Sequence, residues 1–252
     1  MNRRPPESVK RELRKEVGFC CPVQGCDLPY LEWHHFDPPW SKKEHHDPIG
    51  MVALCRQHHI EADNGAFTLE QLRAFKQIPA SEHSRASGKL NWMRHKLLGF
   101  IGGTFYEDVQ TILKIGEEKI IWFERDSEGF ILLNLTLPTT NGPLAIMRDN
   151  EWQNHFIEED IVCPPSSKKI LIRYPENQHI EVMFFEVDSH DSLIKLNPKA
   201  EQFIDNISVP VTVVEVAYKI GDIEFSSKKD VSIGTNKFSI GIVSGASVVF
   251  QL

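Results

Sequence analysis

The pattern of hydrophobic and polar positions changes near residue 103. Before that point, segments with helical spacing alternate with short segments of strand-like pattern. After it come short runs rich in Val, Ile and Phe, separated by turn clusters such as RDSEG, TTNG and PENQ. Runs of this kind are typical of a mostly antiparallel β domain, a sandwich or a barrel. The pattern therefore predicts an α+β chain of two units, residues 1–103 and 104–252.

The first unit is expected to contain short helices and strands. Ser8 can cap a helix over residues 9–17, and Thr68 and Gln71 form a capping box for a helix over residues 69–78. The other expected elements are a strand over 30–34 that ends before the prolines of Phe36–Trp40, an apolar run over 51–54, a helix over 56–63, a polar linker over 80–88, and a helix over 89–101 with apolar residues at 90, 93, 97, 98 and 101.

Composition places the chain among globular proteins. It is 41% hydrophobic and 25% charged, which is the usual balance. The longest apolar runs are too short to span a bilayer. The basic N-terminal segment lacks the apolar core of a secretory signal, so we expect a reducing, cytoplasmic environment. Clustered cysteines in that environment indicate metal ligands rather than disulfides.

Charge is distributed unevenly between the two units. Residues 1–103 carry 15 Lys and Arg against 12 Asp and Glu, a net of +3, and residues 104–252 carry 13 against 23, a net of −10. These sum to the overall −7. The acidity belongs to the second unit, so it does not exclude a nucleic-acid partner for the first. The second unit shows no constellation of catalytic residues.

The stretch from Cys20 to Gly65 holds four of the five cysteines and six of the eleven histidines. Two pairs have the spacing of zinc ligands, C-x4-C at Cys21 and Cys26 and C-x2-H at Cys55 and His58. Tetrahedral zinc accepts such a set. Cys20 could replace Cys21, since the two are adjacent. Cys163 stands apart from the cluster and is expected to be a buried or spare thiol.

Four further side chains in the same stretch remain after zinc is satisfied. His34 and His35 are adjacent on the expected strand and therefore face opposite sides, which suits one metal ligand and one free base. His59 and Asp63 are four apart on the expected helix and share a face, so they could complete a site with His34. A mixed imidazole and carboxylate site with open positions suits a Lewis-acid metal acting on a phosphodiester.

The motifs CCPVQGC, EWHHFDPP and GMVALCRQHHIEADNG resemble those of the HNH endonucleases, the zinc-knuckle type of ββα-metal nuclease. The resemblance covers roughly residues 19–65, with the helix to about 78 as its flank. It implies two strands and a helix around a divalent cation such as Mg²⁺, Mn²⁺ or Ni²⁺, and DNA as the partner. The site residues it implies are His35 as general base, His34, His59 and Asp63 as ligands of the catalytic cation, and Cys21, Cys26, Cys55 and His58 as ligands of structural Zn²⁺.

One position departs from the pattern of this family. A central Asn usually precedes the hydrophobic run before the third zinc ligand, where its side chain holds the loop of the base. This chain has Gly50 at that spacing. Asp47 or His46 could substitute from a shifted position.

The resemblance implies cleavage of DNA, one strand per catalytic centre. A double-strand break would need a homodimer or two sequential events. Basic residues that could contact the DNA backbone, without reading sequence, are Arg3, Arg4, Arg11, Lys42, Lys43, Arg56, Arg73 and Lys76. The alternative is a zinc-scaffolded module that binds nucleic acid or protein without catalysis. In either case the β unit would supply regulation, oligomerisation or target selection, through a ligand or protein partner.

Overall fold

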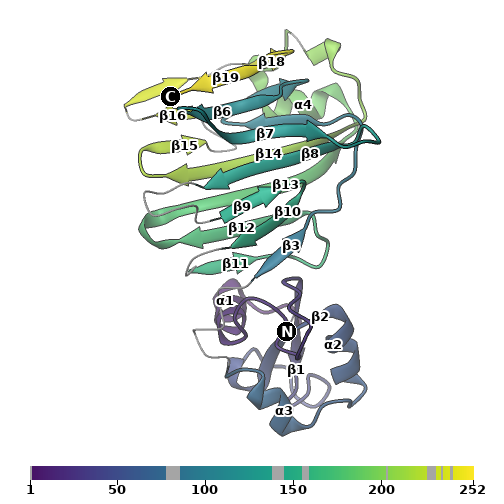
Figure 1. Cartoon of the computed structure of the whole chain (residues 1–252). Helices are drawn as coiled ribbons and strands as arrows, with labels where there is room; N and C mark the ends of the chain where they lie inside the picture. Colours follow the sequence, from purple (N-terminus) through teal and green to yellow (C-terminus); the bar gives the residue numbers. More distant parts are fainter. Residues whose placement is uncertain are drawn as a thin grey trace.

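The structure is a computed structural model that describes residues 2–77, 86–137, 145–154, 159–202, 204–225, 231–233, 235–238 and 241–252. Most of the expected linker lies outside these ranges. Two parts are evident in Figure 1, a small N-terminal module and a larger two-sheet β structure. No helix within the described ranges is both long and apolar enough to cross a membrane.

The N-terminal module is built on a two-stranded hairpin that leads directly into a helix. Its elements are α1 (Glu7–Glu16), β1 (Leu31–His35), a 3₁₀ helix (Pro48–Gly50), β2 (Met51–Cys55), α2 (Arg56–Asp63) and α3 (Leu69–Ala74). β1 and β2 are antiparallel, with His35 opposite Met51 and Leu31 opposite Cys55. All five residues of β2 are buried, because the strand forms the centre of a small core between α1, α2 and α3. The expected strand, the helix over 56–63 and the capping box of α3 are confirmed.

The remaining strands form two sheets. One sheet has the order β19-β6-β7-β8-β9-β10-β3, and the other has the order β11-β12-β13-β14-β15-β16-β17 with β4, β5 and β18 attached. Most neighbours are antiparallel, and the parallel pairs are β4 with β14, β5 with β18 and β6 with β19. The strands are β3 (Ser87–Lys89), β4 (Leu98–Ile101), β5 (Thr104–Glu107), β6 (Thr111–Ile115), β7 (Glu118–Arg125), β8 (Ile131–Leu137), β9 (Ala145–Arg148), β10 (Glu151–Asn154), β11 (Asp160–Val162), β12 (Lys169–Tyr174), β13 (Gln178–Val187), β14 (Val211–Ile220), β15 (Ile223–Phe225), β16 (Val231–Ile233), β17 (Asn236–Phe238), β18 (Ile242–Ser244) and β19 (Val248–Gln251).

The two sheets share one hydrophobic core. Ile121 and Leu133 from the first sheet and Ile172, Val182 and Val214 from the second belong to the same buried cluster. The helix α4 (His190–Leu196) and the 3₁₀ turns Pro175–Asn177, Pro198–Ala200 and Ile204–Asn206 lie in the connections. The expectation of an α+β chain that is mostly sheet is confirmed, with the strands arranged as a sandwich.

The helix expected over residues 89–101 is wrong. β3 pairs with β10, and β4 pairs in parallel with β14, with Leu98 opposite Val213. All four residues of β4 are buried. A strand buried on both faces has a continuous apolar run, which periodicity alone does not distinguish from a buried helix. These pairings place residues 87–101 with the sheets rather than with the N-terminal module.

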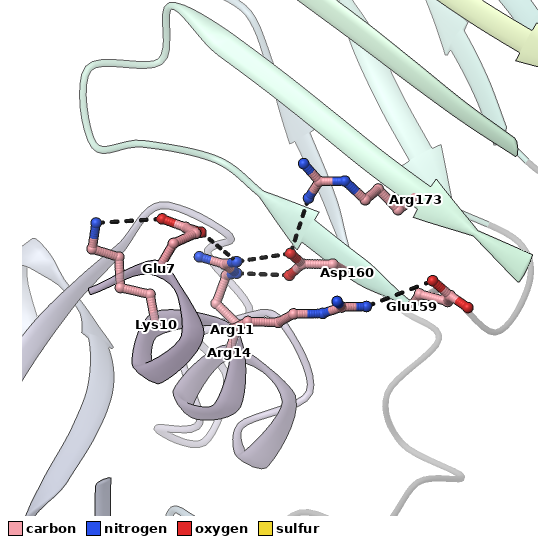
Figure 2. A network of polar contacts seen from close by, with 7 residues as sticks. All are labelled: Glu7, Lys10, Arg11, Arg14, Glu159, Asp160 and Arg173. Atoms are coloured by element: carbon pink, nitrogen blue, oxygen red, sulfur yellow. Dashed lines mark hydrogen bonds and ion pairs between the residues drawn. The ribbon is translucent and has the colours of Figure 1, made fainter. Parts of the chain in front are cut away.

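The module and the sandwich are joined through α1 and β11 by the charged network of Figure 2. Arg14 donates two hydrogen bonds of 2.8 Å to the carboxylate of Asp160, and Arg173 of β12 approaches the same carboxylate at 3.2 Å. Arg11 lies 3.6 Å from Glu159. Phe19 belongs to the core of the sandwich, and the Tyr30 hydroxyl donates to the carbonyl of Lys89 in β3. The two parts therefore share a packed and charged interface.

Candidate metal centres

One cluster of sulfur and nitrogen ligands forms where the hairpin meets α2. Cys21 and Cys26 precede β1, Cys55 is the last residue of β2, and His58 lies in the first turn of α2. One ligand atom from each of these four residues lies within 4.8 Å of all the others. The structure thus assembles the four residues predicted from spacing, and it places Cys21 rather than Cys20 in the cluster.

The distances in this cluster fit a tetrahedral zinc ion. Two thiolates bound to zinc at about 2.3 Å each lie about 3.8 Å apart, and the Sγ atoms of Cys26 and Cys55 are 3.7 Å apart. His58 Nδ1 lies 3.3 Å from Cys21 Sγ and 3.2 Å from Cys55 Sγ. Its Nε2 lies 3.9 Å from a Glu61 carboxylate oxygen, the kind of outer partner that orients a ligating imidazole.

The surroundings of two of these cysteines affect the ionisation of their thiols. Burial raises the pKa of the Cys21 thiol, and burial also raises that of Cys26, because a thiolate is poorly solvated there. A bound cation reverses this preference and deprotonates coordinating thiols. Cys163 lies apart from this cluster, buried in the core of the sandwich, as the sequence predicted.

A second cluster forms between β1 and α2. His34 of β1 and His59 and Asp63 of α2 place one ligand atom each within 4.8 Å of one another. His34 Nδ1 is 3.2 Å from Asp63 Oδ1, and His59 Nδ1 is 3.6 Å from Asp63 Oδ2. The first approach is not aligned as a hydrogen bond. Two atoms that ligate one cation at about 2.1 Å and at a right angle lie about 3 Å apart, so the donor set and its spacing fit a divalent cation.

Glu32 lies beside this second cluster, in contact with His59, although the sequence reasoning missed it. Its carboxylate lies 3.6 Å from His59 Nδ1. Glu32 and His34 are two residues apart on β1, and side chains with that separation share one face of a strand. The alternation of the strand was therefore the signal that could have found it. The cluster itself offers two imidazoles and one carboxylate, with the Glu32 carboxylate next to it, and such groups suit a hard or borderline divalent cation.

His35 faces away from the second cluster, as the alternation of the strand predicted. Its ring lies 4.7 Å from that of Trp40, 5.2 Å from that of His45 and 5.8 Å from that of His46. The side chain is buried, at 3% exposure, and neither ring nitrogen makes an aligned hydrogen bond to a described residue. Burial, followed by the charges of His45 and His46, lowers the pKa of His35 to about 4. The imidazole is therefore neutral near pH 7, and it is a weaker base there than a solvent-exposed histidine.

The pKa of His34 is lowered as well, first by burial and then by the charge of His59, while Asp63 opposes both effects. A neutral imidazole is the form that ligates a metal. The two adjacent histidines thus lie in different surroundings, one among carboxylates and one among aromatic rings. Such separation is the arrangement needed for two distinct chemical roles.

Gly50, which stands where the HNH endonucleases usually have Asn, has no room for a side chain. A Cβ atom there would lie 1.9 Å from the carbonyl oxygen of Asp37. That close approach has a cause, because the Gly50 carbonyl accepts hydrogen bonds from the backbone N–H groups of Phe36 and Asp37. The glycine therefore lets the segment before β2 pair tightly with the end of β1, and an Asn at this position would not fit.

Neither residue expected to replace the family's Asn reaches across this loop. The Asp47 carboxylate accepts from the N–H of Ile49 and caps the 3₁₀ helix. His46 Nε2 contacts the Asn2 carbonyl at 2.9 Å. His45, which the sequence reasoning did not select, is the residue that spans it, because its Nε2 contacts the Pro38 carbonyl at 2.8 Å and its Nδ1 accepts from the N–H of Asp47 at 3.1 Å.

Five of the basic residues expected at a DNA surface differ in their surroundings. Lys42, Lys43 and Arg56 are exposed on the module. Arg11 faces the sandwich through Glu159. Lys76 pairs with Glu16 and donates to two backbone carbonyls beside β2. Lys76 thus has a structural role, and Arg11 is partly engaged in the interface.

Comparisons with known proteins found no match to this chain. No protein-family model matches the chain, and no curated protein or solved structure is significantly similar to it.

Proposed function

We propose that this chain is a metal-dependent endonuclease that hydrolyses DNA phosphodiester bonds, with His34, His35 and His59 as its catalytic residues. The observation that carries the proposal is that two adjacent histidines of β1 face opposite sides of the strand, in different surroundings. His34 lies with His59 and Asp63, while the next residue, His35, lies on the opposite face among the rings of Trp40, His45 and His46. The hairpin and α2 supply the two strands and the helix that the HNH resemblance implies. The thiol cluster favours a reducing, cytoplasmic location.

The residues of the chain would divide the reaction as follows. Cys21, Cys26, Cys55 and His58 would hold Zn²⁺, which ties the segment before β1 to the start of α2. His34, His59 and Asp63, with Glu32 beside them, would hold Mg²⁺, Mn²⁺ or Ni²⁺. A cation bound there supplies Lewis-acid stabilisation of charge on the phosphate and on the leaving oxygen.

The proton transfer belongs to His35. Its imidazole accepts a proton from water as the water oxygen forms a bond to phosphorus. The bond between phosphorus and the 3′ oxygen breaks, and the electron pair leaves with that oxygen, which takes a proton from solvent. The products are a 5′-phosphate and a 3′-hydroxyl. One module carries one such centre, so each event cuts one strand.

Cleavage of supercoiled plasmid tests the proposal. Protein freed of its labile metal, with its zinc counted, is incubated with plasmid and Mg²⁺, Mn²⁺ or Ni²⁺. The proposal expects nicked or linear product only when a divalent cation is added back, with new ends that carry 5′-phosphate. No product with any of the three cations, from protein that retains its zinc, would contradict it.

One observation favours a second candidate, a zinc-scaffolded module that binds nucleic acid or protein without catalysis. His35 is 3% exposed and has the Trp40 ring against it, so the base is covered. This alternative expects the same protein to retard DNA in a gel without cutting it in any cation.

A further inference from the structure

We propose that His45 is the positioning residue for His35. It fixes the loop between β1 and β2, and its ring packs against the ring of the base. The inference rests on the proposed function, since it concerns the same site. It assigns a role to a histidine that lies outside both ligand clusters and outside the predicted set of site residues.

The hydrogen bonds of His45 define a single state of its ring. Nδ1 accepts from the backbone N–H of Asp47, so Nδ1 carries no proton. Nε2 must then carry the proton and donate it to the Pro38 carbonyl, 2.8 Å away. Both ring nitrogens are thus used, and both partners are backbone atoms. A ring held in this way has a fixed tautomer and a fixed orientation.

The two backbone partners lie at opposite ends of the loop. Pro38 comes three residues after the end of β1, and Asp47 caps the 3₁₀ helix that leads into β2. The imidazole therefore bridges the exit of one strand and the entrance of the other. Only 8% of His45 is exposed, which shields these bonds from competition with water.

The base itself depends on this support. Neither nitrogen of His35 makes an aligned hydrogen bond to a described residue, so the rings packed against it and the nearby backbone of His45 hold its orientation. Of the three rings around it, Trp40 and His46 are only partly buried, whereas His45 is buried. The His45 ring is nearly perpendicular to that of His35, at 87° and 5.2 Å. Loss of the His45 ring would let the His35 side chain move, and small displacements of a reacting group lower the rate on the order of 10²-fold.

Plasmid nicking by three variants tests the inference. His45→Ala removes both bonds, and His45→Gln restores a donor that can reach the Pro38 carbonyl. Asp47→Ala is the matched control in the same loop, because it keeps the backbone N–H that donates to His45. We expect His45→Ala to lower kcat about 10- to 100-fold with KM within about twofold and zinc unchanged. We expect His45→Gln to recover most of the rate and Asp47→Ala to stay within about fivefold of the parent.

Imidazole ¹⁵N NMR gives a readout that does not depend on cleavage. The inference expects His45 in the Nε2–H tautomer, and it expects the His35 signals to move in His45→Ala but not in Asp47→Ala. Parent-level cleavage by zinc-loaded His45→Ala would overturn it. If the parent protein does not cleave plasmid, the proposed function fails. The NMR comparison still tests the role of His45 in that case, because unchanged His35 signals in His45→Ala would overturn the inference. Should His45→Ala fail to fold, His45→Gln decides, since a folded, zinc-loaded His45→Gln that loses 10-fold or more of the nicking rate would overturn the inference.

Discussion

Arg14 and Asp160 form a bidentate ion pair between the N-terminal module and the sandwich, with both N–O distances at 2.8 Å. The side chains are only 4% and 1% exposed. Such a pair is costly to break from one side, because the remaining charge stays buried. The carboxylate keeps Arg173 as a second partner, whereas the other carboxylate that pairs with Arg14 among the described residues is the more exposed Glu7.

We predict that Asp160→Ala destabilises the protein by about 3–5 kcal/mol, because it leaves the buried Arg14 guanidinium without its main partner. The measurement is the free energy of unfolding in urea. Glu159→Ala is the matched control on the adjacent residue. Its pair with Arg11 is roughly half exposed on both sides, and such pairs contribute about 0–1 kcal/mol. Equal losses in the two variants would contradict a structural role for the buried pair.

Zinc content distinguishes two adjacent cysteines. Cys21 belongs to the ligand cluster and Cys20 does not, although both are buried. We predict one zinc per chain in the parent and in Cys20→Ser, and a loss of at least half of it in Cys21→Ser, because one thiolate of the tetrahedral set is missing. Metal analysis after gel filtration measures this. Retention of full zinc by Cys21→Ser would show that the four ligands are assigned wrongly.

Restoring an Asn at the family's usual position is expected to harm this protein. The Cβ of any residue at position 50 would meet the Asp37 carbonyl, so Gly50→Asn should cost about 1–3 kcal/mol or more. Gly65→Asn is the control, because that position follows α2 with open space around it and Asn tolerates a positive φ. The measurement is the urea midpoint. A Gly50→Asn variant as stable as the parent would refute the tight contact described above.

DNA affinity should depend on which basic residues face solvent. We predict that Lys42→Ala weakens DNA binding at low salt and reduces the slope of log K against log [salt] by about 1, because one phosphate contact is lost. Arg11→Ala should leave that slope nearly unchanged, since Arg11 faces Glu159. Fluorescence anisotropy at several salt concentrations measures both. The reverse order would place the DNA on the α1 side of the module.

Local patterns were sufficient for much of the N-terminal module. The junction between β2 and α2 follows from a short apolar run and then eight residues without a helix breaker. The opposite orientations of His34 and His35 follow from the pleat of a strand. These features depend on neighbours in the sequence, which is why they could be predicted. The two ligand clusters join residues that are distant in the sequence, and the ligand chemistry and the HNH resemblance indicated them.

Features that depend on distant partners could not be predicted. β4 resembles a helix segment because its apolar run is short and continuous, and its partner β14 lies more than 100 residues away. His45 carries no motif, and its partners are backbone atoms of the loop. Arg14 could not be assigned to an interface, since its partner is 146 residues distant. Long-range packing decides such cases over local propensity.

The role of His35 as general base is tested by the plasmid-nicking rate of His35→Ala beside the parent, at equal zinc content and in the divalent cation that supports the fastest cleavage. We predict a loss of about 10²- to 10⁴-fold, the usual contribution of a general base, with the zinc still bound. A His35→Ala protein that cuts plasmid as fast as the parent would contradict the assignment of the base and the mechanism built on it.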